Sequence, residues 1–368
     1  MRLRGLMRKE FLQIVRDPSS IAIAFLMPVV LLLLFGYGVS LDAKHVPVAL
    51  VVEQPSADAA SFTGAFRHSR YFEPVALPSL DAARRAVRAG RVDGIVRLRE
   101  DFAARLRTPA GAPIQVLLDG VDANTARIVK GYVEGVWARW LEQRAERQGR
   151  ELVTPVNLRH RVWFNAELRS RNYLVPGLVA VIMTLIGALL TAMIMAREWE
   201  RGTMEALLVT PVAMGEILLG KLLPYFVLGM GGMALSVLMS VWLFEVPLRG
   251  SPLVLLAAAA LFLLAALGMG LLISIVAKNQ FVAGQAAIVV TFLPAFMLSG
   301  FIFDIGSMPG PIRALTYVIA ARYFVSILQT VFLAGNVWSV IVPNAAALLA
   351  MATLFLGLAR RKARKRLE

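Results

Sequence analysis

Cysteine is absent from the 368-residue sequence, and histidine nearly so. Without cysteine the chain has neither a disulfide nor a thiolate catalyst, so each domain must be held together by packing. The three histidines, His45, His68 and His160, are scattered and lack the spacing of metal ligands. Neither H-E-x-x-H nor G-x-S-x-G occurs. The sequence therefore gives no sign of a metal centre or a hydrolase site.

Ionisable side chains are also missing from six long apolar runs: Pro18–Leu41, Asn172–Ala196, Leu222–Phe244, Gly250–Ala277, Asn279–Phe303 and Val337–Leu358. Each can cross a bilayer core about 30 Å thick as a helix, which takes roughly 20 residues. Backbone exposed to lipid must satisfy its own hydrogen bonds, which favours helices. Proton- and ion-coupled pumps generally carry ionisable groups inside the membrane. We therefore expect six transmembrane helices in a protein that takes its energy from elsewhere.

Positive charge dominates the chain, with a formal net charge of +15 and basic clusters at both ends. In a soluble protein this excess would suggest nucleic acid, but here much of it flanks the apolar runs, and no nucleic-acid partner is expected. Lys and Arg next to membrane spans mark the cytoplasmic side. Both termini are therefore predicted to be cytoplasmic, which requires an even number of spans.

A polar insert at residues 42–171 separates the first two apolar runs and has the size of one domain. Its pattern predicts strands at 46–52, 71–76, 92–98 and 114–118, with helices at 56–67, 79–89, 101–107 and 124–147. Such alternation is typical of a compact α/β domain. Ser79 is the expected cap of its helix. The predicted fold class is an α-helical polytopic membrane protein of six transmembrane helices with an inserted extracytoplasmic α/β domain.

The remaining segments complete this organisation. The first 19 residues combine apolar positions at helical spacing with basic ones, as in a helix at the cytoplasmic interface. Transmembrane helix 1 is expected at 20–41 and is favoured as an uncleaved anchor. Residues 172–359 would hold helices 2–6, with a cytoplasmic loop at 197–221 and an external segment at 304–336. The external segment is predicted to form a re-entrant hairpin or interfacial helices. Residues 360–368 are predicted to form a basic cytoplasmic tail.

One short pattern resembles a nucleotide-binding loop. Gly215, Gly220 and Lys221 have the spacing G-x-x-x-x-G-K, but Leu222 stands where magnesium binding needs Ser or Thr. No predicted strand leads into it, so the match is interpreted as accidental. Lys221 is instead interpreted as an interface anchor at a helix end.

The loop after the second apolar run combines acidic groups with an apolar ridge. Glu198, Glu200 and Glu205 precede three apolar residues and then Pro211, where a short helix would break. An amphipathic helix of this kind can dock a partner. Its composition fits an ordinary connection between helices equally well.

Several motifs spread over the whole chain resemble one family, the type-2 ABC exporter permeases, in the bacterial multidrug-exporter-like subgroup with a large external domain between spans one and two. They are RKEFLQIVRDP near the N-terminus, FGYG at the end of the first run, LLDGVDANTA, VWFNAELRSRNYLVPG before the second run, and E-x-E-x-G-T-x-E from Glu198 to Glu205. Ala166 stands where the subgroup usually has proline, which leaves one local turn in doubt.

The resemblance implies a permease subunit without its own ATPase site. Its implied partners are a cytoplasmic ABC ATPase carrying ATP and magnesium, a second permease copy (homodimer or paralogue), membrane lipids and a periplasmic adaptor protein. The implied location is the bacterial inner membrane and the implied cargo a drug or lipid-like molecule. It assigns coupling to the ATPase to the residues Glu198, Glu200, Gly202, Thr203, Glu205 and Pro211.

Two other functions stay open at this point. A secondary transporter would need an ion site of carbonyls and hydroxyls, for example near Thr184, Thr191 or Ser236. A membrane sensor would bind a ligand in its external domain and move nothing across the bilayer. Measuring flux distinguishes both from an ATP-driven exporter.

Overall fold

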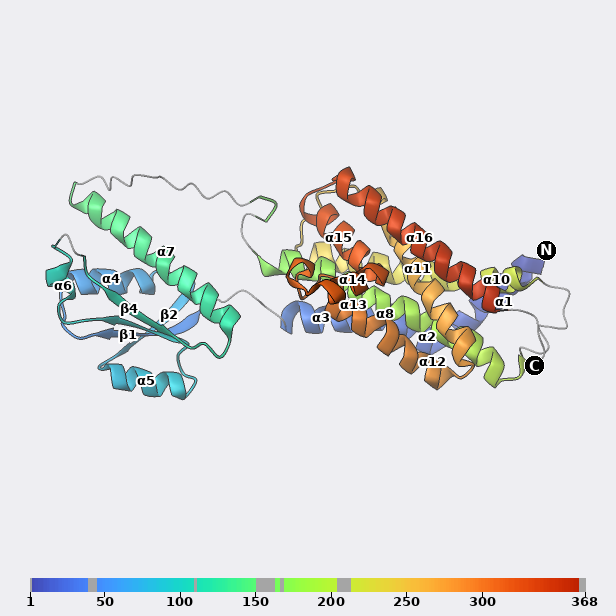
Figure 1. Cartoon of the computed structure of the whole chain (residues 1–368), viewed down its shortest axis with the longest axis horizontal. Coiled ribbons are helices and arrows are strands. Elements are labelled where there is room, and N and C mark those ends of the chain that lie inside the picture. The colour runs from blue at the N-terminus through green and yellow to red at the C-terminus, as the bar shows by residue number, and fades with distance from the viewer. Residues whose placement is uncertain are drawn as a thin grey trace. The chain divides into compact units, whose positions relative to one another are not determined.

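The computed structural model describes residues 2–38, 45–108, 111–149, 163–165, 169–203 and 213–363. The chain forms two compact units: Met1–Ser40 together with Arg161–Glu368, and Leu41–His160 (Figure 1). The smaller unit is the polar insert, and the larger one holds the apolar runs.

The smaller unit is built on a four-stranded sheet of order β2-β1-β3-β4, with strands β1 (Val46–Val52), β2 (Phe72–Leu77), β3 (Gly94–Leu98) and β4 (Ile114–Leu118). Strand β1 runs parallel to β2 and β3, whereas β4 is antiparallel to β3. The two crossovers, through α4 (Ala57–Arg67) and α5 (Leu80–Arg88), run in opposite directions along the sheet. Right-handed crossovers therefore place these helices on opposite faces. Figure 1 shows α4 and α7 (Ala123–Arg147) over one face and α5 over the other.

The core of this unit follows the two-residue alternation of β1. Val48 and Leu50 pack toward α4 and α7, and Ala49 and Val51 pack toward α5. All eight predicted strands and helices are present, with α6 (Phe102–Arg105) shorter than expected. The Ser79 hydroxyl accepts a hydrogen bond from the Ala82 amide, which confirms the predicted cap.

The larger unit is helical, and six of its helices are long and apolar enough to cross a membrane: α2–η1–α3 (Pro18–Gly38), α8 (Ser170–Glu200), α10–η2 (Met214–Leu243), α11 (Pro252–Ala277), α12–η3–α13 (Gln280–Leu298) and α16 (Trp338–Lys362). Helix α1 (Arg2–Val15) precedes them. The prediction of a polytopic helical membrane protein is thereby confirmed.

Between the fifth and sixth of these helices lies a sharply bent pair. Gly310–Val318 (α14 and η5) meets Ala320–Leu333 (α15) at 84°, after a short turn at Ile305–Ser307 (η4). Such a bend fits either a broken span, which would be a seventh, or the re-entrant segment predicted from the sequence.

Two of the spans contain a widened π-helical turn just before a proline. The turn η1 (Ala22–Leu26) precedes Pro28, and η3 (Ile288–Phe292) precedes Pro294. Proline lacks an amide hydrogen, and its ring crowds the carbonyl one turn back, so a local π turn lets the helix continue. Each of these spans therefore continues as one helix past its proline.

Helix α8 lies at the centre of the larger unit. Its most apolar 18-residue window is 94% buried, against 22% for the first, fifth and sixth spans. It packs so closely on α11 that a Cβ added at Gly270 would overlap the Ala188 carbonyl oxygen. The Thr191 hydroxyl donates to the Leu267 carbonyl across the same contact, at 2.9 Å.

We predict that Gly270→Ala separates α8 from α11 and destabilises the protein, because its methyl group would overlap backbone atoms. Overpacking of this kind costs about 1–3 kcal/mol. The apparent Tm of purified protein in detergent measures the effect. Gly357→Ala on α16 is the matched control, since no atom lies within 4 Å of an added Cβ there. Equal Tm values for the two variants would contradict the close packing.

Candidate functional site

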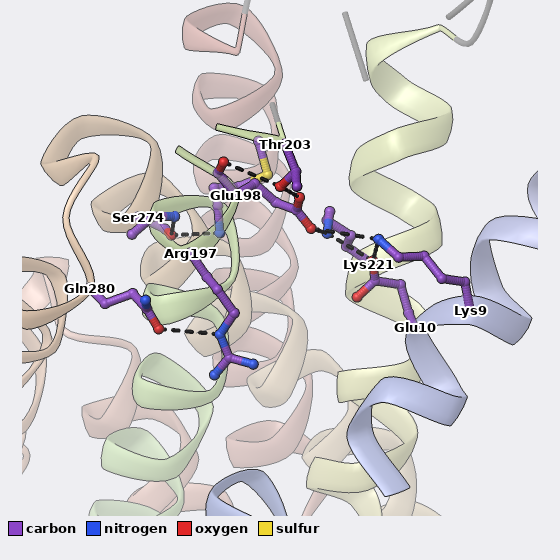
Figure 2. A network of polar contacts seen from close by, with 10 residues as sticks. Lys9, Glu10, Arg197, Glu198, Thr203, Lys221, Ser274 and Gln280 are labelled. Atoms are coloured by element: carbon purple, nitrogen blue, oxygen red, sulfur yellow. Dashed lines mark hydrogen bonds and ion pairs between the residues drawn. The ribbon is translucent and has the colours of Figure 1, made fainter. Parts of the chain in front are cut away.

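Three charged side chains from three helices meet in the interior at one end of α8. The Lys221 ammonium on α10 lies 2.8 Å from Glu10 Oε1 on α1 and 2.7 Å from Glu198 Oε1 on α8. Lys221, Glu10 and Glu198 are only 4%, 2% and 6% exposed. Figure 2 shows Lys221 between the two carboxylates. We call Glu10, Lys221 and Glu198 the ion triad.

Local structure explains why each member is buried. Glu10 and Ile14 are one turn apart and form the inward face of α1. Helix α10 begins at Met214, where Glu216 accepts a hydrogen bond from the Ala213 amide, so Lys221 lies two turns inside the helix. The prediction that Lys221 lies at a helix end is therefore wrong, because this span starts earlier than its uncharged run.

The charges of the ion triad are nearly balanced. Two carboxylates face one buried ammonium, and Lys9, at the exposed edge, lies 3.8 Å from Glu198 and 3.6 Å from Glu10. The Thr203 hydroxyl donates a hydrogen bond to the second oxygen of Glu198. Buried ions are tolerated only when they are paired and hydrogen-bonded, and loss of one partner leaves an uncompensated charge. The triad therefore holds α1, α8 and α10 to one another.

A second polar contact joins α8 to two more spans, and we call it the Arg197 bridge. The Arg197 guanidinium lies 3.2 Å from Asp17 Oδ2 at the start of α2 and donates to Gln280 Oε1 on α12, also at 3.2 Å. The Gln280 amide in turn donates to Glu200 Oε1 at 2.9 Å. Figure 2 shows Arg197 pointing away from the ion triad, toward Gln280.

The charge of Asp17 is stabilised in this bridge. Burial acts to raise the pKa of its carboxyl, but hydrogen bonds from Ser20 and Arg197, with the positive charge of Arg197, outweigh it and lower that pKa. A lowered pKa stabilises the fold above the unfolded-state value, and this stabilisation is lost as the pH falls through the folded-state value. The Arg197 bridge is therefore an ion pair at neutral pH.

Of the six residues assigned to coupling, Glu198, Glu200 and Thr203 take part in these contacts. Glu198 belongs to the ion triad, and Glu200 accepts both hydrogen bonds from Gln280. Gly202, with φ of +67°, ends α8 in the left-handed conformation that favours glycine. Thr203 contacts Glu198, while Glu205 and Pro211 lie outside the described residues. Their proposed role in coupling stays a prediction.

Sequence reasoning missed Glu10, Lys221, Asp17 and Gln280. One signal was available, because Glu10 is the sole acidic residue among the first 16, in an otherwise basic helix. A lone acidic residue on the apolar face of a basic helix suggests a buried cationic partner. Nothing in the sequence identified that partner as Lys221.

Comparison with known proteins agrees with this architecture. The family described as "ABC-2 family transporter protein" matches residues 18–361. The chain therefore belongs to the ABC-2 family of transporter permeases, which confirms the resemblance seen in the sequence.

Curated relatives extend the similarity over the whole chain. The chain is 49% identical to the probable multidrug ABC transporter permease YbhS of Escherichia coli (strain K12), covering 100% of this chain and 98% of the relative. It is 28% identical to the probable multidrug ABC transporter permease YbhR of the same strain, over 90% of each chain. It is 26% identical to the ABC transporter permease protein NatB of Bacillus subtilis (strain 168), over 82% of this chain and 83% of that one.

We predict that Lys221→Met destabilises the protein by about 3–5 kcal/mol, because it leaves the two buried carboxylates of Glu10 and Glu198 facing only the exposed Lys9. The fall in the Tm of the purified protein in detergent measures this loss of stability. The double variant Lys221→Met/Glu198→Gln should recover most of the loss, since only Glu10 and the nearby Lys9 then stay charged. A Lys221→Met variant with the Tm of the unmodified protein would show that the ion triad does not hold these helices.

Proposed function

We propose that this ABC-2 permease is the membrane subunit of an ATP-driven exporter, and that a separate cytoplasmic ATPase supplies the energy. The observation that carries the proposal is the ion triad with the Arg197 bridge. Together they join α1, α2, α8, α10 and α12 at the end of α8, where the segment expected to meet the ATPase begins. Movement of that segment would be transmitted to four spans at once, those that contain α2, α8, α10 and α12.

The coupling step follows from these contacts. ATP and magnesium would bind on the partner ATPase, and closure of the ATPase dimer would move the segment that starts at Arg197. Glu198 would carry this movement to α1 and α10 through Lys221, and Glu200 would carry it to α12 through Gln280. Gly202 would let the chain leave α8 sharply, and Glu205 and Pro211 would continue the contact surface.

In this proposal both termini are cytoplasmic, the α/β unit is extracytoplasmic, and the protein resides in the bacterial inner membrane. The basic residues near both ends support that orientation. The α/β unit would gate release or meet a periplasmic adaptor protein.

The transported molecule is proposed to be hydrophobic or amphipathic, such as a drug or a lipid. The printed names of two relatives contain "multidrug". A cavity among the spans, beside Thr184 and Thr291, holds about 50 Å³, whereas ligand pockets hold roughly 300–1,000 Å³. A single chain in this conformation therefore cannot enclose a drug there, which supports a path formed with a second permease copy.

The two alternative functions have less support. The hydroxyls of Thr184, Thr191 and Ser236 each donate to a carbonyl oxygen one turn back on their own helix, so each one already has a structural role. Such groups favour helix packing over an ion site. A sensor would bind the ATPase without any flux.

We predict that proteoliposomes containing the permease transport a lipophilic dye only when its ATPase and ATP are both present.

Glu200→Arg should also reduce co-purification of the ATPase, because it reverses charge beside the proposed docking segment. Glu142→Arg, on the exposed side of α7, is the matched control. Transport without any ATPase would contradict the exporter, whereas full ATPase binding by Glu200→Arg would remove only this docking residue.

A further inference from the structure

An open basic depression of about 860 Å³, called the cavity below, lies beside the Arg197 bridge, between α1, the start of α2, the end of α8 and the start of α12. Five cationic side chains line it, together with a single carboxylate, that of Asp17. Such a cavity attracts a compact anion with more than one negative charge or acceptor oxygen.

Three of the cations are left over after the internal ion pairs are counted. Lys9 pairs with the ion triad and Arg197 with Asp17. Arg8, Arg16 and Arg201 are exposed and form no ion pair with any carboxylate that the structure describes. Guanidinium groups bind phosphate oxygens through paired hydrogen bonds. Arg8 lies on α1, Arg16 directly follows α1, and Arg201 directly follows α8, so one phosphate group could bridge the two helices.

An apolar edge of α1 adjoins the cavity. Phe11 and Val15, one turn apart on that edge, are 55% and 56% exposed, and the exposed Leu12 lines the cavity itself. A helix with a basic face next to an apolar face lies in the headgroup region, with its apolar side against acyl chains. A phosphate in the cavity would then have hydrocarbon directly beside it. The cavity would bind the phosphate of a phospholipid, and the apolar edge of α1 would contact its acyl chains. A free phosphate or an acidic peptide would not need the apolar edge.

We propose that this cavity binds the phosphate of an anionic membrane phospholipid, with its acyl chains along Phe11 and Val15. The inference rests on the proposed function only for placing α1 at the membrane surface. The bound lipid would tie α1 to the end of α8, next to Asp17 and Arg197, and would set how firmly α1 follows α8 during coupling.

The test is native mass spectrometry of the purified full chain, without ATPase, from mixed micelles of phosphatidylglycerol and phosphatidylcholine. The unmodified protein should retain phosphatidylglycerol preferentially, and Arg16→Gln/Arg201→Gln should lower that preference by about tenfold. Arg16→Lys/Arg201→Lys should keep part of it. Arg85→Gln/Arg88→Gln, with the same charge change on α5 of the other unit, should keep all of it.

Other outcomes identify other occupants and overturn the proposal. Unchanged lipid retention in Arg16→Gln/Arg201→Gln would show that the cavity holds no lipid. Inorganic phosphate at millimolar concentration displacing the lipid completely would indicate a simple anion site. In the co-purification assay used for Glu200→Arg, loss of the ATPase by Arg16→Gln/Arg201→Gln, with lipid retention unchanged, would make the cavity an ATPase docking surface. The two proposals can fail separately. Absence of dye transport in the proteoliposome experiment would contradict the proposed function, whereas lipid retention is measured without transport and tests only this inference.

Discussion

The ammonium group of Lys221 is held between two carboxylates in the interior of the helical unit, and its neighbours have to stay in place around it. A buried charge that loses its partner costs several kcal/mol, so the two contacts resist separation of α1 and α8 from α10 far more strongly than apolar contacts that can slide. Apolar side chains in a membrane have little preference between protein and lipid. In such surroundings, a charged contact determines which helices move together.

The rest of the helical unit is arranged around α8, whose end carries Glu198. Close packing at Gly270 fixes α8 against α11 along its length, and the Arg197 bridge fixes its end against α2 and α12. The π turns before Pro28 and Pro294 let the first and fifth spans continue past these prolines. A movement at the end of α8 would therefore be transmitted to α11, to the first span through Asp17 and to the fifth span through Gln280.

Much of the fold could be predicted from the sequence, because its signals are local. The spans follow from runs without charge, and the strands of the insert from alternation, down to the cap at Ser79. The ion triad could not be predicted from the sequence, since Lys221 and Glu10 are 211 positions apart and only packing brings them together. The early start of α10 also hid Lys221, which lay just outside the uncharged run. The family resemblance pointed to Glu198, but not to Lys221, whose ammonium group pairs with it.

The most direct measurement is the number of dye molecules transported per ATP hydrolysed, in proteoliposomes that contain the permease and its ATPase. It compares the unmodified protein with Glu10→Gln/Lys221→Met/Glu198→Gln, in which the ion triad is replaced by neutral side chains of similar size and no buried charge is left unpaired. Our account predicts that this variant folds, binds the ATPase and allows hydrolysis, while transport per ATP falls by about tenfold, a loss within the usual range of coupling energies. A folded variant that transports as much per ATP as the unmodified protein would contradict the claim that the ion triad carries the coupling.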